Sequence, residues 1–88
     1  MLAEDPQALF DHFVPKARSY VESPGVMTAL ELNDLCERLY PLVARKLGNR
    51  ELSEKIRSFS RGLPRKEPHE LTRLLDEIME DARNAGLG

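Results

Sequence analysis

Apolar residues recur every three or four positions along this chain, and four segments share this helical spacing. In residues 6–22 the apolar positions lie within an arc of about 140° at about 100° per residue, which is typical of one buried helix face. Asp5 is a suitable N-cap, and Pro6 suits the first helical position. Pro15 removes a backbone donor without shifting the stripe. The pattern therefore predicts one helix over 6–22, kinked at Pro15.

A second apolar stripe of similar width predicts a helix over 28–47. Thr28 and Glu31 have the spacing of a capping box, in which each side chain accepts a hydrogen bond from a backbone donor of the first turn. Pro41 interrupts the segment as Pro15 interrupts the first, so a kink is expected there. Gly48 ends this helix.

The third stripe, over 50–61, is narrower, and a fourth covers 68–85. Asn49 can cap the third helix, and Gly62 ends it. No segment alternates with a period of two residues, so no strand is expected. The connections are short, as between antiparallel helices. The sequence therefore predicts an all-α fold, a compact bundle of four helices in a single domain spanning 1–88.

Charged residues are sorted along the chain, although the net charge is only −2. Residues 1–37 contain two basic and seven acidic residues, residues 38–66 nine basic and two acidic, and residues 67–88 two basic and six acidic. A basic segment therefore lies between two acidic flanks. Such a segment can attract an anionic partner even in an acidic protein, unless the flanks neutralise it within the fold.

The basic segment supplies the main candidate binding surface. On the predicted third helix, Arg50, Arg57 and Arg61 lie opposite Leu52, which places them toward solvent. An exposed arginine row suits contact with phosphates or carboxylates. The candidate partner- or anion-binding residues are Arg45, Lys46, Arg50, Arg57, Arg61, Arg65 and Lys66. Alternatively, Glu54 on the same row and the acidic fourth helix pair with these charges.

The junction between the second and third helices resembles the turn of a helix-turn-helix DNA-binding motif. In the sequence Ala-Arg-Lys-Leu-Gly, which ends at Gly48, a small residue precedes the glycine by four positions. The resemblance covers about 20 residues. The chain departs from the motif at Asn49 and Glu54, where apolar residues are usual, and Ile56 comes two positions late. The resemblance implies nucleic-acid binding through the basic segment 45–66.

Most aromatic residues lie on the first helix, which raises the question of what they contact. Phe10, Phe13 and Tyr20 form one wall of the core in a monomer, or part of an interface if the bundle leaves an apolar face uncovered. Tyr40, at the edge of the second stripe, is a further candidate contact. The core assignment is favoured, and a protein interface remains the alternative.

The residues that could perform chemistry lack the partners that chemistry needs. Cys36 lies on an apolar stripe beside Glu37, the setting of a buried structural cysteine rather than a reactive thiol. His12 and His69 have no second ligand at a recognised metal spacing. There is no glycine-rich phosphate loop and no nucleophile motif. We therefore expect no catalysis, no metal, no cofactor and no small-molecule substrate.

The hydropathy, the charge at the N-terminus and the cysteine content indicate where the protein is located. No apolar run approaches the ~20 residues of a membrane span, and acidic residues stand where a signal peptide would be positive. A single cysteine implies no oxidising compartment. We expect a complete, cytoplasmic small protein. The favoured function is a non-catalytic helical adaptor or regulator that binds a protein, or itself, through helix faces. The alternative is a nucleic-acid-binding regulator.

Overall fold

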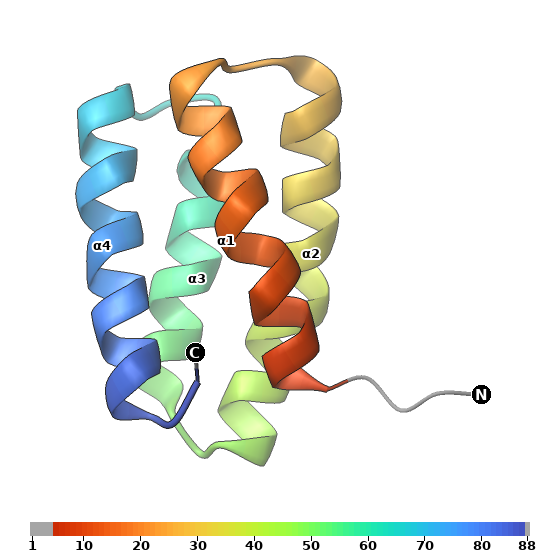
Figure 1. The fold of residues 1–88 in the computed structure, drawn as a ribbon, viewed down its shortest axis with the longest axis vertical. Coiled ribbons are helices and arrows are strands. Elements are labelled where there is room, and N and C mark those ends of the chain that lie inside the picture. Colours follow the sequence, from red (N-terminus) through yellow and green to blue (C-terminus); the bar gives the residue numbers. More distant parts are fainter. Residues whose placement is uncertain (1–4, 88) are drawn as a thin grey trace.

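The computed structural model describes residues 5–87, which form four helices and no strand (Figure 1). The helices are α1 (Pro6–Glu22), α2 (Val26–Lys46), α3 (Arg50–Gly62) and α4 (Pro68–Asn84). This confirms the predicted all-α four-helix bundle. Residues 1–4, on which the expectation about a signal peptide depends, lie outside the described residues, as does residue 88.

Both helices with an internal proline continue through it. Pro15 lies inside α1 and Pro41 inside α2, and neither ends its helix. At the start of α1 the Asp5 side chain accepts a hydrogen bond from the Gln7 backbone N–H at 3.3 Å, as expected for an N-cap. Pro6 occupies the first turn, where its missing N–H has no helical partner to lose.

The start of α2 differs from the prediction. The helix begins at Val26, two residues before the expected start, and its N-cap is Gly25 without a side-chain hydrogen bond. The extended Gly25 backbone lets its carbonyl accept from the Ala29 N–H at 2.9 Å, so the helix is already under way at Thr28. The predicted capping box is therefore wrong. The earlier start adds Val26 and Met27 to the helix.

Helices α2 and α3 run antiparallel, side by side (Figure 1). Near their connection the Ser53 hydroxyl donates to the Tyr40 carbonyl at 2.8 Å, and toward the far end the Ser60 hydroxyl donates to the Asn33 side-chain oxygen. Two contacts so far apart require lengthwise packing. The crossing at about 90–120° that is typical of a helix-turn-helix motif is therefore not present between these two helices.

The turn between these helices is set by Gly48 and Asn49. Gly48 has a φ of +62°, a left-handed conformation that glycine adopts without penalty, and it ends α2. The Asn49 N–H donates back to the Val43 carbonyl at 3.3 Å. The Asn49 side chain then accepts from the Leu52 N–H at 3.0 Å, which confirms the predicted cap of α3.

The core lies between the four helices, with α1 and α3 each packed against both α2 and α4. Phe13 and Phe59 meet edge to face at its centre, with ring centroids 5.6 Å apart. The largest fully buried side chains are Phe13, Phe59, Leu32, Leu39, Leu52, Ile56, Leu71 and Ile78. The predicted stripes therefore supply the core, and the polar faces stay outside.

Candidate functional site

An open apolar groove lies at the end of the bundle where α1 joins α2 and α3 joins α4. This end is at the top of Figure 1. The groove has a volume of about 420 Å³. The residues that line it and define the apolar groove below are Tyr20, Pro24, Gly25, Val26, Ala29, Leu30 and Pro64.

Three large apolar side chains at the start of α2 are exposed beside or within the groove. The exposed fractions are 77% for Val26, 70% for Met27 and 60% for Leu30. Leu30 follows Val26 by four residues and Met27 by three, so all three share one side of the helix. At about 100° per residue, Leu30 lies about 160° from the buried Leu32 and cannot join the core. These residues form a second apolar face of α2.

Sequence reasoning missed this second face, although the signal was present. The predicted helix starts at residue 28, so Val26 and Met27 lie before it, and Leu30 lies between the two residues of the predicted capping box. A helix that begins at Val26 instead places three apolar residues off the core stripe. The spacing of Val26, Met27 and Leu30 could have revealed them.

A buried hydrogen bond fixes the floor of the groove. The Tyr20 hydroxyl donates to the Leu63 carbonyl at 2.7 Å, so the end of α1 is tied to the loop after α3. Leu63 is itself buried, and Pro64 follows it at the groove wall. A satisfied bond of this kind contributes about 1 kcal/mol and holds the loop in place. The groove is therefore pre-formed.

The groove continues into a basic region. An adjoining depression of about 300 Å³ shares Ala29, Leu30 and Pro64 with the groove and also contacts Arg61 and Arg65. On the other side of these two arginines is a hollow of about 310 Å³. The residues that line it and define the basic hollow below are Ser58, Arg61, Gly62, Arg65 and Lys66.

Among the described residues, the cations of the basic hollow have no acidic partner. Within residues 5–87, neither Arg61, Arg65 nor Lys66 forms an ion pair. No carboxylate from this part of the chain lines the groove or the hollow. The end of the bundle therefore presents an apolar surface bordered by three positive charges.

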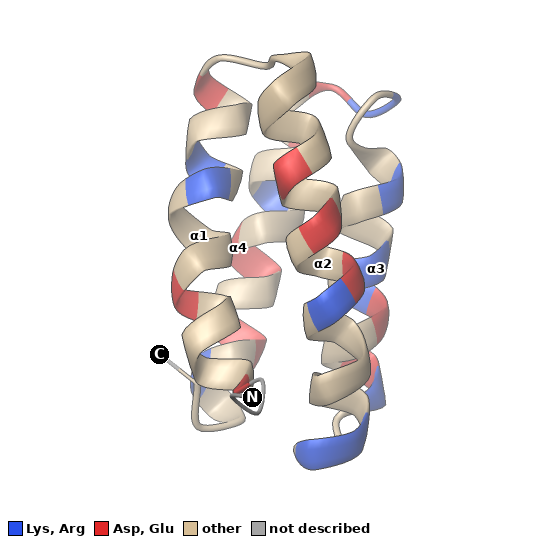
Figure 2. Ribbon diagram, turned by 90° about the vertical axis from the view of Figure 1, so that its right-hand side faces the viewer, with Lys and Arg blue, Asp and Glu red and all other residues tan. Residues whose placement is uncertain are grey.

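The other predicted basic residues lie outside the basic hollow. Arg45, Lys46 and Arg50 flank the turn between α2 and α3 and are exposed. Arg57 lies between the two ends of α3, 4.0 Å from the Glu54 carboxylate and 5.7 Å from the centroid of the Tyr40 ring. Figure 2 shows basic residues along the outer side of α3 and in the loop after it, with acidic residues on α2 nearby. The predicted basic residues therefore extend from the α2–α3 turn along α3 to the loop after it, and only Arg61, Arg65 and Lys66 lie in the basic hollow.

Acidic residues of α4 pair with a lysine that the sequence analysis did not single out. The Lys55 ammonium lies 2.6 Å from the Asp81 carboxylate, 3.6 Å from Glu77 and 3.9 Å from Glu51. The hydrogen bond to Asp81 raises the pKa of Lys55, against a smaller opposing effect of desolvation. The expected pairing between α4 and the basic segment thus occurs through Lys55 rather than through the arginine row.

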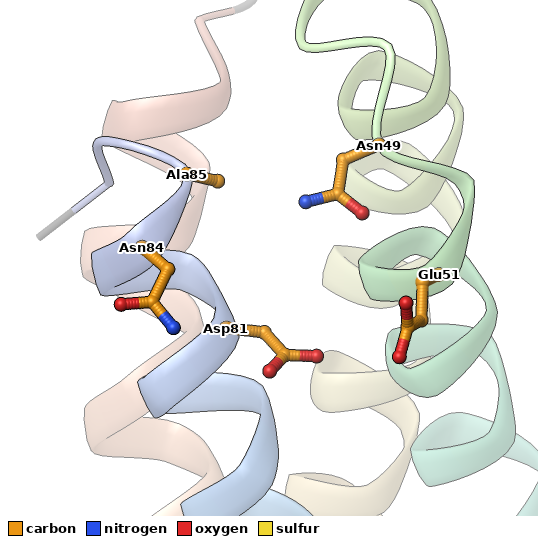
Figure 3. Close-up of a pocket in the computed structure, with 5 residues that line it drawn as sticks. All are labelled: Asn49, Glu51, Asp81, Asn84 and Ala85. Carbon is orange, nitrogen blue, oxygen red and sulfur yellow. The ribbon is translucent and has the colours of Figure 1, made fainter.

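A polar pocket of about 190 Å³ lies at the end of the bundle opposite the groove (Figure 3). Asn49 and Glu51 from the start of α3 face Asp81 and Asn84 from the end of α4. Because Lys55 already lies near both carboxylates, part of their charge is offset within the fold. This pocket is therefore a weaker candidate than the groove.

The aromatic residues considered for an interface are divided between the core and the surface. Phe10, Phe13 and Tyr20 are buried, with at most 7% of any of them exposed, so little of their side chains is available to a partner. Tyr20 nevertheless contributes one edge to the apolar groove. Tyr40 is half-buried and lies beside Arg57.

Cys36 is fully buried in the core. Burial raises the pKa of its thiol to about 12, and a hydrogen bond with Ser60 opposes this only in part. A thiol with so high a pKa stays protonated and is a poor nucleophile at neutral pH.

Two further properties concern metals and membranes. Within residues 5–87, no three His, Cys, Asp or Glu side chains are grouped so that they could hold a metal ion. No helix of this region has the length and apolar character needed to cross a membrane.

Comparison with models of protein families, with characterised proteins and with solved structures finds no match to this chain.

Proposed function

We propose that this protein is a small non-catalytic interaction module that binds a segment of a partner protein in the apolar groove. The observation that carries the proposal is the exposure of Val26 and Leu30, which line a pre-formed depression, together with Met27 on the same side of α2. Leaving three large apolar side chains in water forgoes their burial energy, and contiguous exposed apolar surface of this kind is typical of interaction sites. None of the three contributes to the buried core.

A second copy of the chain is a poorer occupant than another protein. In a two-fold dimer the same patch of both copies meets. Arg61 and Arg65 border the groove, so such a dimer would bring the unpaired arginines of the two copies together. Like charges in contact oppose association. The charges thus favour a different partner.

The nucleic-acid alternative has less support. Base stacking needs exposed aromatic rings among the basic residues. Tyr40 has such a position, but the Arg57 guanidinium already lies over its ring. Midway along α3, Arg57 also lies 4.0 Å from the Glu54 carboxylate, so the row of arginines on this helix is interrupted by an ion pair.

Site-specific photo-crosslinking tests the proposal. p-Benzoylphenylalanine replaces Met27 in one chain and Leu47 in a matched control, because Leu47 is an exposed apolar residue beside the turn at the opposite end of the bundle. In extracts of the native cells, we expect a discrete crosslinked protein from the Met27 position only. That protein is then purified and its Kd measured with the wild-type chain.

Substitutions in the reconstituted complex decide the outcome. We expect Leu30→Asp to weaken binding roughly 30-fold or more, as for loss of a central apolar anchor. Leu47→Asp is expected to leave the Kd unchanged. The proposal is overturned if Leu30→Asp binds as well as the wild type, or if crosslinking occurs equally from both positions.

A further inference from the structure

The apolar groove and the basic hollow form one continuous surface. The depression between them shares Leu30 and Pro64 with the groove, and Arg61 and Arg65 with the hollow. A segment that lies along this path passes from apolar side chains to cations. An occupant that matches both parts therefore combines apolar and anionic groups.

The loop after α3 holds the cations together. The backbone N–H groups of Arg65 and Lys66 both donate to the Gly62 carbonyl, at 3.0 and 2.8 Å. This tight turn keeps both residues next to Arg61 at the end of the helix. Gly62 has a second effect, because the stem of Lys66 passes where a side chain would be. A Cβ at this position would lie only 2.7 Å from the Lys66 Cδ atom.

The net charge of the hollow is positive. The C-terminus of α3 contributes a partial negative charge of about one half. Arg61, Arg65 and Lys66 together exceed it several-fold, and none of them is paired within residues 5–87. The surface is therefore suited to carboxylates, which accept forked hydrogen bonds from guanidinium groups.

We infer that the docked segment is an acidic amphipathic polypeptide, with apolar side chains in the groove and Asp or Glu carboxylates at Arg61, Arg65 and Lys66. This inference rests on the proposed function and specifies the chemistry of its partner. The charge complementarity supports an acidic partner, and the apolar groove favours a polypeptide over a nucleic acid, which has no aliphatic side chains to place there.

A peptide selection tests this inference while the partner is still unidentified. Random peptides of about 16 residues, long enough for four helical turns, are displayed and selected on the full-length chain. We expect enrichment of peptides that combine Leu, Ile or Phe with Asp and Glu and are negatively charged overall. The best peptide is synthesised, and its Kd is measured by fluorescence anisotropy at low and high salt.

Charge reversal identifies the residues responsible. Arg61→Glu/Arg65→Glu is expected to weaken the selected peptide on the order of tenfold at low salt, and less at high salt, where rim charges are screened. Arg45→Glu/Arg50→Glu, the matched pair near the opposite end of the bundle, is expected to have no such effect. A version of the peptide with Lys in place of each Asp and Glu should regain affinity for the Arg61→Glu/Arg65→Glu chain.

The outcomes separate this inference from the proposed function. Peptides that bind and depend on Leu30 but show no acidic bias would overturn the inference and leave the proposed function standing. A selection that yields no binding peptide would overturn both. The inference also fails if a single-stranded oligonucleotide of equal charge displaces the selected peptide at a lower concentration, or if light scattering shows a dimer that Leu30→Asp disrupts.

Discussion

The absence of a side chain at Gly62 contributes to the shape of the basic hollow. Gly62 is a buried helical residue whose φ is not in the left-handed region, so glycine is not required by its backbone conformation. What glycine permits is the close approach of the Lys66 stem. The position of the Lys66 ammonium in the hollow therefore depends on a residue that carries no charge.

Gly62→Ala separates helix stability from the geometry of the hollow. Alanine raises helix propensity, so we expect the free energy of unfolding to rise by up to about 1 kcal/mol, less the small cost of displacing a flexible lysine. Binding of an acidic peptide is expected to weaken, because the ammonium moves. Urea unfolding and peptide titration measure the two effects. With Lys66→Ala as background, Gly62→Ala should no longer affect binding, and a persistent effect would contradict the explanation.

The burial of Cys36 makes a second prediction about a single residue. Because burial raises the pKa of its thiol to about 12, from an ordinary value of 9.0, the folded protein holds almost no thiolate at pH 8. We expect a disulfide reagent to label native Cys36 on the order of 10³-fold or more slowly than the urea-unfolded chain, since labelling requires opening of the core. A Cys36→Ala chain carrying Ser58→Cys is the exposed control. Equal rates for native and unfolded Cys36 would refute the assignment.

At the scale of elements, Lys55 joins α3 to α4. Its ammonium interacts with two carboxylates of α4 and one of its own helix, whereas most other ion pairs described lie on exposed surface. These interactions raise the pKa of Lys55 above the ordinary value of 10.5. The folded state therefore binds this proton more tightly than the unfolded state does.

The raised pKa of Lys55 makes its contribution to stability dependent on pH. The contribution is fully present below pH 10.5, and it is lost as the pH rises through the higher value of the folded state. We expect Lys55→Met to lower the urea midpoint at pH 7 and 9, and the difference from wild type to shrink at pH 11. Other groups that ionise there are common to both chains and cancel.

Lys16→Met is the control, because it removes the exposed ion pair with Glu31. We expect it to lower the free energy of unfolding by less than about 1 kcal/mol. A difference that stays constant up to pH 11 would exclude this mechanism.

The helices themselves could be predicted because each combines a stripe of apolar residues with clear end signals. Asn49 and Gly48 mark one junction correctly in both sequence and structure. The start of α2 could not be fixed in the same way, because Thr28 offers a side-chain cap that the extended Gly25 backbone makes unnecessary. Because the predicted start of α2 is two residues too late, the sequence pattern did not predict the apolar groove.

The site depends on tertiary contacts that periodicity does not encode. Residues 61–66 and 20–30 are far apart in the sequence, and the Tyr20–Leu63 hydrogen bond that joins them is a property of the folded chain. Helical phase placed the arginines of α3 outside the core. It could not show that Arg61 would border an apolar surface while Arg57 lies beside Tyr40.

At the scale of the whole molecule, the two ends of the bundle differ in how their charges are used. At the end formed by the α2–α3 turn and the C-terminus of α4, Asp81 and Glu51 both interact with the Lys55 ammonium, which offsets part of their charge. At the opposite end, Arg61 and Arg65 have no counter-charge among the described residues, and apolar side chains are exposed beside them. The first end therefore has an ion-pair network within the fold, whereas at the other end cations and apolar side chains are exposed side by side, which supports the proposed binding surface.

If the groove end exists for binding, its apolar residues should contribute little to folding. Leu30 and Leu32 allow a matched test, because they lie two residues apart in α2, and Leu30 is 60% exposed whereas Leu32 is fully buried. We expect Leu32→Ala to lower the free energy of unfolding by about 2–5 kcal/mol, through lost burial and the cavity left behind. Leu30→Ala should change it by less than about 0.5 kcal/mol, because the two substitutions alter helix propensity equally and only one empties the core. Urea unfolding of both variants measures the difference. Comparable losses of unfolding free energy would mean that Leu30 is part of the folding core. The exposed face of α2 would then no longer support a binding site for a partner.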